Sequence, residues 1–259
     1  MTNLDFIYRG DTIDFMQSLP PACGHLIIAD PPYNIDKDFG EGTFFEEHEI
    51  WIAWSKRWLG EAKRLLTENG NLFVYALHRN ACYLQCVLYE LGLTYRRQII
   101  WTYENGWSKY RNGPACHYEP ILWFARSSCS TYHTIREPYK STERLRHRII
   151  KNGKVWTPNP EGRQGGDVWR FPTLAGRRFA AERVEHPTQK PVALSQRLVR
   201  HFSNPGELVL VPFVGSGTEC VAAKQLGRRF AGAEINPPYV EIAERRVASV
   251  AHSEVEVPG

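Results

Sequence analysis

Short apolar runs alternate with helical patterns along most of this chain, and this alternation limits the fold more than any other feature. The runs are rich in β-branched and aromatic residues and lie at 6–8, 26–29, 71–75, 95–101, 118–124, 208–211 and 229–233. Helical patterns lie at 11–19, 50–66, 79–91, 190–203, 218–226 and 238–249. This order predicts an α/β domain, a mostly parallel sheet with helices on both faces. Functional residues should then follow the apolar runs, because ligands bind at the carboxyl ends of such strands.

The bulk properties agree with one intracellular domain. A chain of 259 residues with 42% hydrophobic residues can bury a full core. Its first residues carry acids and no apolar run, which argues against a signal peptide, and no stretch is long enough to span a membrane. The six cysteines have no paired C-x-x-C spacing, so we expect no metal site and reduced thiols. We therefore predict a cytoplasmic protein.

Positive charge is concentrated in one part of the chain. Residues 136–183 hold twelve Lys or Arg and five Asp or Glu, a net charge of +7, which leaves −3 elsewhere in a chain of total charge +4. The same stretch is rich in Gly, Pro and Asn and lacks sustained periodicity, so it is predicted to be an irregular insert. Two interpretations stay open, a solvated face and a surface that binds a polyanion.

A glycine-rich turn follows the apolar run at 208–211 and precedes a helical pattern. Gly215 and Gly217 let the backbone approach a ligand closely. Glu234 ends the next predicted strand, 17 residues after Gly217, where an acid can accept both hydroxyls of a ribose. Cys220 replaces the third glycine of a dinucleotide site and the turn has no basic residue. The pattern favours a nucleoside cofactor without a pyrophosphate, such as S-adenosylmethionine, over a purely structural turn.

The tetrapeptide Asp30-Pro31-Pro32-Tyr33 follows another apolar run. The prolines stiffen the loop, so that the Asp30 carboxylate and the Pro31 carbonyl can point the same way. Two acceptors on the N–H groups of an exocyclic amine would favour a pyramidal nitrogen whose lone pair faces a methyl donor. Tyr33 would stack on the base, a contact worth about 1–3 kcal/mol. We predict that this segment is catalytic.

A near twin, Asn236-Pro237-Pro238-Tyr239, follows Glu234. Asparagine is a good helix N-cap and proline is favoured in a first helical turn. The C-terminal copy is therefore predicted to start a helix rather than to catalyse. A C-cap is likewise expected at Asn69-Gly70, where the helical pattern of 50–66 should end.

Seven motifs together resemble the β group of amino-methylating DNA methyltransferases, in which the catalytic segment comes early and the cofactor glycine loop late. The resemblance covers nearly the whole chain and rests, in order, on GDTIDFMQSLP, IIADPPYN, HYEPILWFARS, GDVWRFP, HPTQKP, PFVGSGT and GAEINPPYVEIAERRV. It implies a seven-stranded, mixed, Rossmann-like sheet in circularly permuted motif order. It also implies methyl transfer from S-adenosylmethionine to a DNA base flipped out of the duplex.

The resemblance assigns the cofactor to several segments. Its adenine would lie at Asp11 and Thr12, and Glu234 would hold the ribose. The methionine carboxylate would meet Thr188 and Lys190. The full set of expected cofactor contacts is Asp11, Thr12, Asp30, Thr188, Lys190, Phe213, Gly215, Ser216, Gly217, Thr218, Glu234 and Asn236. Plainer roles stay open for two of them, an N-cap for Asp11 and a surface position for Lys190.

The insert at 131–185 occupies the place where this family reads its DNA target, which favours the polyanion interpretation. The expected DNA contacts are Trp107, Lys109, Tyr110, Arg111, Arg144, Arg146, Arg148 and Lys151. For the aromatic residues of the loop at 103–114, surface packing is the open alternative. A homodimer and a paired restriction endonuclease are also left open.

One position departs from the family. An aspartate usually precedes the Pro-Phe of the glycine loop, whereas this chain has Val211. Because that acid would help to hold the amino end of methionine, we expect weak cofactor binding. Asp30 favours adenine N6 as the acceptor, since the cytosine N4 members more often carry serine there. The alternatives are a cytosine N4 enzyme and a DNA-binding homologue with weakened catalysis.

Overall fold

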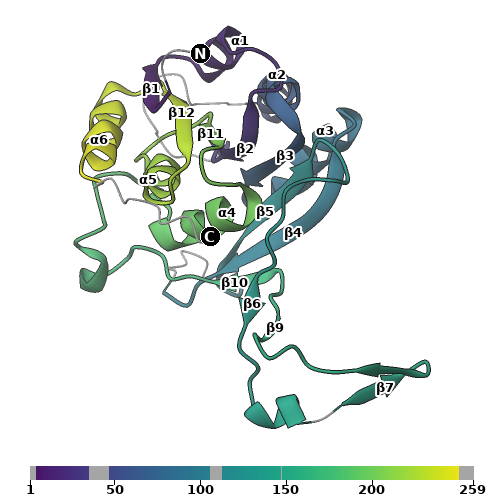
Figure 1. The fold of residues 1–259 in the computed structure, drawn as a ribbon. Helices are drawn as coiled ribbons and strands as arrows, with labels where there is room; N and C mark the ends of the chain where they lie inside the picture. The colour runs from purple at the N-terminus through teal and green to yellow at the C-terminus, as the bar shows by residue number, and fades with distance from the viewer. Residues whose placement is uncertain (1–3, 35–46, 106–112, 147, 251–259) are drawn as a thin grey trace.

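The computed structural model describes residues 4–34, 47–105, 113–146 and 148–250, and an eight-stranded mixed sheet forms their centre (Figure 1). The strand order is β1-β12-β11-β2-β3-β5-β4-β10. The strands are β1 (Phe6–Arg9), β2 (Gly24–Ala29), β3 (Leu66–Tyr75), β4 (Thr94–Thr102), β5 (Tyr118–Ala125), β10 (Val168–Arg170), β11 (Leu208–Val211) and β12 (Arg229–Glu234).

All seven predicted strands are present, and the insert adds an eighth. Strand β10 pairs in parallel with β4 at the edge of the sheet. The five strands from β1 to β3 in the spatial order run parallel to one another, whereas β5 runs antiparallel to both β3 and β4. The expected mixed, mostly parallel sheet is therefore confirmed, with one strand more than the motifs implied.

In the described part of the chain, six α-helices cover the two faces of the sheet. They are α1 (Thr12–Ser18), α2 (His48–Leu65), α3 (Ala81–Glu90), α4 (Val192–Phe202), α5 (Thr218–Gln225) and α6 (Pro237–Ala248). Ile27 and Ala29 of β2 pack in one core with α1, α2 and α3, while Leu26 and Ile28 pack in the other with α4, α5 and α6. This alternation follows from the two-residue period of a strand. Within the described ranges, no helix has both the length and the apolar character needed to cross a bilayer.

The predicted helix end at Asn69-Gly70 is wrong. Helix α2 ends at Leu65, and β3 begins at the next residue, so that Asn69 and Gly70 lie within the strand. Gly70 supplies a close approach instead of a cap, since a Cβ there would lie 2.9 Å from the Thr67 carbonyl oxygen. No break separates the buried Leu65 from the buried Leu66, and the polar residues at 67–71 follow only after the strand has begun, which hides the boundary in the sequence.

The insert forms a long arm that projects from the body (Figure 1). At its foot, β6 (Arg136–Glu137) pairs with β9 (Arg163–Gln164), and at its far end β7 (Ile149–Lys151) pairs with β8 (Lys154–Trp156). Short 3-10 helices lie at Thr142–Arg146 and Arg177–Phe179. The insert is therefore more ordered than expected. The two-stranded hairpin of β7 and β8 is too thin to hold a core. Apolar side chains there are therefore exposed, as at Ile150 and Trp156.

Candidate active site

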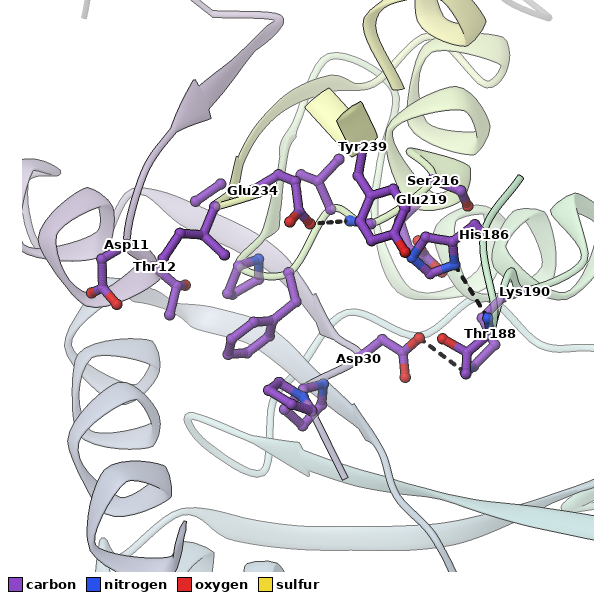
Figure 2. Close-up of a pocket in the computed structure, with 18 of the residues that line it drawn as sticks. Asp11, Thr12, Asp30, His186, Thr188, Lys190, Ser216, Glu219, Glu234 and Tyr239 are labelled. Atoms are coloured by element: carbon purple, nitrogen blue, oxygen red, sulfur yellow. Dashed lines mark hydrogen bonds and ion pairs between the residues drawn. The ribbon is translucent and has the colours of Figure 1, made fainter. Parts of the chain in front are cut away.

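Four neighbouring parallel strands, β1, β12, β11 and β2, end at one edge of the sheet, and a cavity of about 930 Å³, counting its open mouth, lies there. Figure 2 shows Asp11 and Thr12 at one end of this cavity, Thr188, Lys190 and His186 at the other, and Asp30 and Glu234 between them. The lining residues are Gly10, Asp11, Thr12, Asp30, Pro31, Pro32, Tyr33, Trp54, His186, Thr188, Lys190, Pro212, Phe213, Val214, Gly215, Ser216, Glu219, Ala233, Glu234, Ile235 and Tyr239.

Asp30 lies directly after β2 and is paired with Lys190. The Lys190 ammonium is 2.9 Å from Asp30 Oδ2 and 3.6 Å from the Glu119 carboxylate, and its side chain is only 4% exposed. Lys190 also donates to the Tyr33 hydroxyl at 2.8 Å, and that hydroxyl donates to Asp30 Oδ1. Both oxygens of the carboxylate are thus bound by side chains of this site.

The environment fixes the charges of this group. Burial alone would lower the pKa of Lys190, but the Asp30 and Glu119 carboxylates raise it above its usual value. Burial, and after it the charges of Asp30 and Glu119, raise the pKa of Tyr33 well above the ordinary range. Near neutral pH, Lys190 is therefore a cation and Tyr33 an intact hydroxyl.

The loop after Asp30 is held by its backbone carbonyls. The Trp51 indole N–H donates to the Pro32 carbonyl at 2.8 Å, and the Asn80 side-chain amide donates to the Tyr33 carbonyl. Within the described part of the chain, no donor binds the Pro31 carbonyl, and Pro31 lines the cavity. The Pro31 carbonyl is therefore available as a second acceptor, and that it points the same way as the Asp30 carboxylate stays a prediction.

Glu234 and the glycine turn are joined by hydrogen bonds. The Gly215 amide donates to Glu234 Oε2 at 2.7 Å and the Asn236 amide donates to Oε1 at 2.9 Å. Gly215 has a φ of +50°, and a Cβ there would lie 2.9 Å from His186 Nε2, so only glycine suits the position. Burial raises the pKa of Glu234, while these backbone amides lower it in part.

The end of the cavity at Asp11 and Thr12 contains the N-cap of α1 and a buried side-chain hydroxyl. Asp11 is the N-cap of α1, because its carboxylate accepts from the Ile13 and Asp14 amides at 2.7 and 3.2 Å. The buried Thr12 hydroxyl has no hydrogen-bond partner among the residues described. A ligand with ring nitrogens and an amino group can satisfy such a hydroxyl, so the cavity suits a nucleoside.

Three expected cofactor contacts lie outside the cavity wall: Gly217, Thr218 and Asn236. A Cβ at Gly217 would lie 2.8 Å from that of Ala243, so this glycine allows α6 to pack closely. The Thr218 hydroxyl donates to the Lys190 carbonyl at 3.2 Å. Their contact with cofactor stays a prediction.

The C-terminal tetrapeptide starts a helix, as predicted. Asn236 is the N-cap of α6 and the two prolines open its first turn. The Asn236 side chain makes no capping hydrogen bond, however, so the proline geometry rather than the amide favours this start. Tyr239 of the same copy also lines the cavity, with its ring centroid 4.6 Å from that of His186.

Nine lining residues were not among the predicted contacts: Gly10, Trp54, His186, Pro212, Val214, Glu219, Ala233, Ile235 and Tyr239. His186 begins the quoted HPTQKP motif, and Glu219 directly follows the quoted PFVGSGT motif, so both had a local signal. Trp54 had none, because it reaches the cavity from α2 by packing on Phe213, with ring centroids 5.6 Å apart.

The expected DNA contacts fall into two sets. Trp107, Lys109, Tyr110 and Arg111 lie outside the described residues. Arg144 and Arg146 lie in the first 3-10 helix of the arm, and Arg148 and Lys151 flank or belong to β7. The side chains of Arg148 and Lys151 are exposed.

The sequence profile described as "DNA methylase", of the N6/N4 type, matches residues 24–245. The chain belongs to this family of DNA methyltransferases. It is 33% identical over 252 residues to the type II methyltransferase M1.MboII of Moraxella bovis, covering 94% of this chain and 96% of that protein. It is 31% identical to the DNA adenine methyltransferase YhdJ of Escherichia coli K12, covering 96% and 85%.

A solved structure gives the same family. The complex of M1.HpyAVI with S-adenosylmethionine aligns with a TM-score of 0.61 and 25% identity, covering 93% of this chain and 98% of that one. The family depends on S-adenosylmethionine, and this methyltransferase uses that cofactor on DNA. The orphan Thr12 hydroxyl and the glycine cradle at Gly215 suit the nucleoside part of the cofactor.

Proposed function

We propose that this methyltransferase modifies the exocyclic N6 amino group of adenine in DNA. The observation that carries the proposal is Asp30, which lies in the cavity beside the Pro31 carbonyl. The likeness to a relative named as a DNA adenine methyltransferase supports it. The resemblance adds that cytosine N4 members more often have serine at position 30.

We also propose an orientation for the cofactor. Its adenine lies at Asp11 and Thr12, where the unused hydroxyl can bind it, and the ribose hydroxyls lie at Glu234. The reactive methyl group faces Asp30, because the target amine must meet both. The methionine carboxylate lies near Thr188, since Lys190 is engaged by Asp30 and Glu119.

The cofactor supplies an electrophilic methyl group, and the chain's residues prepare the acceptor. The Asp30 carboxylate and the Pro31 carbonyl accept the two N–H groups of the amine, which keeps its lone pair available. Each Asp30 oxygen can accept a second hydrogen bond beside its contact with Tyr33 or Lys190, so the amine can be bound while both contacts persist. The ion pair with Lys190 at 2.9 Å holds the Asp30 carboxylate in position to accept from the amine.

The arm within 131–185 is proposed to hold the DNA. Its foot is neutralised in part, since Glu137 accepts from Arg163 and Arg197. The hairpin beyond it carries exposed Arg148 and Lys151, which suit phosphate groups. Trp107, Lys109, Tyr110 and Arg111 stay candidates for contacts with the displaced strand.

The decisive experiment combines the purified protein, cofactor carrying a deuterated methyl group, and mixed-sequence DNA. Mass spectrometry of the digested nucleosides should find labelled N6-methyldeoxyadenosine. Labelled N4-methyldeoxycytidine would instead establish the cytosine alternative. Binding of DNA without any labelled nucleoside, in a protein that also fails to bind the cofactor, would establish the weakened homologue.

A further inference from the structure

Glu219 is a buried acid in the cavity wall with no role in the proposed function. It is the second residue of α5 and is 4% exposed. One carboxylate oxygen accepts from the Ser195 hydroxyl at 3.0 Å. The charges of Lys190 and Arg246 also act on this carboxylate, but within the described residues neither forms an ion pair with it. Burying a carboxylate without a directly paired cation is costly, so a cationic ligand group beside Glu219 would be favourable.

The end of β11, where Val211 lies, cannot supply a negative charge to a ligand. Val211 is fully buried in the core that contains α4 and α5, and it does not line the cavity. The acid that the resemblance leads one to expect at this position is therefore replaced by apolar packing. Glu219 lies eight residues further on, at the other side of the same glycine turn, and does line the cavity.

The position of Glu219 matches one end of the cofactor. Figure 2 shows it on the side of the cavity that also holds His186 and Lys190, away from Asp11 and Thr12. With the ribose at Glu234 and the methyl group at Asp30, the methionine end must extend toward this side. Burial lowers the pKa of His186 to about 4, so that this imidazole is neutral near pH 7 and does not repel a cation.

We propose that Glu219 binds the ammonium group of the cofactor's methionine end and replaces the acid missing from position 211. The proposal rests on the cofactor orientation proposed above. The Asp30 carboxylate is engaged by Lys190 and Tyr33. Glu219 accepts from the Ser195 hydroxyl, and the charges of Lys190 and Arg246 act on it, but within the described residues neither cation forms an ion pair with it. Binding of the cofactor then pairs a buried carboxylate with a cation.

Three ligands separate this role from a structural one. S-Adenosylmethionine carries the ammonium and the sulfonium, S-adenosylhomocysteine carries only the ammonium, and 5′-methylthioadenosine carries neither. Glu219→Gln keeps the shape of the side chain and its acceptor for Ser195. Calorimetry should show about tenfold or greater weakening for the first two ligands, as loss of a charged hydrogen bond gives, and unchanged binding of 5′-methylthioadenosine.

Other outcomes overturn the proposal. Equal weakening of all three ligands would show a structural effect on the pocket. Weakening of S-adenosylmethionine alone would assign the carboxylate to the sulfonium, and unchanged binding of all three would remove Glu219 from the site. Glu219→Asp keeps the charge on a shorter side chain. It should bind S-adenosylmethionine and S-adenosylhomocysteine more tightly than Glu219→Gln does.

A matched variant tests the orientation separately. Glu234→Gln should weaken all three ligands, because each contains the ribose. If Glu234→Gln leaves 5′-methylthioadenosine binding intact, the proposed orientation fails, whatever Glu219→Gln does. If Glu234→Gln behaves as expected while Glu219→Gln does not discriminate between the ligands, only the Glu219 proposal fails.

Discussion

Charged side chains are mostly buried and paired in the cavity, whereas those on the arm are exposed to solvent. In the cavity, Asp30 and Lys190 are mostly buried and paired at 2.9 Å, and Glu234 accepts two backbone amides. On the arm, even the close Arg146–Glu143 pair is 74% and 62% exposed. Buried pairs are screened little by salt, whereas exposed charges are screened strongly. Cofactor binding and methyl transfer should therefore depend on individual side-chain contacts in the cavity. DNA binding should depend on how many exposed positive charges the arm carries.

The largest effect is expected from placing a charge in the apolar core directly before the glycine turn. Val211→Asp puts a carboxylate into an apolar core without a partner, at a cost of about 3–5 kcal/mol in unfolding free energy. Denaturant unfolding measures this cost, and Val211→Ala serves as the size control. A stable Val211→Asp that binds S-adenosylmethionine more tightly would restore position 211 as a cofactor contact.

Within the cavity, Asp30→Ala should abolish most of the chemistry. It removes an acceptor that acts mainly in the transition state, so turnover should fall on the order of 10²–10³-fold or more. Cofactor affinity should change little, and the salt dependence of DNA binding should be that of the wild type. Single-turnover methylation and calorimetry provide the two measurements. Wild-type turnover in a folded Asp30→Ala would remove the carboxylate from the reaction.

Glu219 offers a pH test of burial in the cavity. Burial, and then Asp30, raise the pKa of Glu219 to about 7, although Lys190 and the Ser195 hydroxyl act against this rise, and it also faces Tyr75 and Arg246. The folded protein therefore binds a proton more tightly than the unfolded chain, and stability is lost as pH rises from about 4.3 to 7.

Glu219→Gln should not lose stability in this pH range through position 219, because glutamine does not titrate. The ligand-free variant should gain on the order of 1–3 kcal/mol relative to the wild type between pH 5 and pH 8. Denaturant unfolding at both pH values measures the difference, and the His186 contribution cancels because both proteins contain it. A difference that does not change with pH would mean that Glu219 titrates normally.

The arm should respond to salt where the cavity does not. Removing two exposed cations in Arg148→Gln/Lys151→Gln should reduce the slope of log affinity against log salt by about 0.9 for each lost phosphate contact. Lys56→Gln/Arg57→Gln removes two exposed cations from α2 and is the matched control. Trp156, which is 65% exposed, should also change its fluorescence on DNA binding. Equal slopes for both variants would separate the arm from DNA.

The smallest effect is expected at the second Pro-Pro-Tyr segment. Because the Asn236 side chain makes no capping hydrogen bond, Asn236→Ala should cost no more than about 0.5 kcal/mol. Methylation should be retained, since Asn236 does not line the cavity. Thermal unfolding and an activity assay suffice. Loss of methylation in a stable Asn236→Ala would make this copy part of the active site.

Local sequence patterns suffice to predict the seven strands, the helix start at Asn236, and the positions of Asp30 and Glu234 at strand ends. These features depend on local patterns, namely apolar periodicity, proline geometry and the order of strand and loop. The same local patterns could not place the boundary between α2 and β3, because the polar and glycine residues at 67–71, which resemble a helix end, lie inside the strand.

Contacts between residues far apart in the sequence are seen only in the tertiary structure. It pairs Asp30 with Lys190, 160 residues later, adds β10 to the sheet edge, and brings Trp54 and Glu219 into one cavity. No local pattern encodes such contacts, because they depend on the spatial order of the strands and on how the helices pack against them. Burial then sets the charge states, which raises the pKa of Glu219 and lowers that of His186.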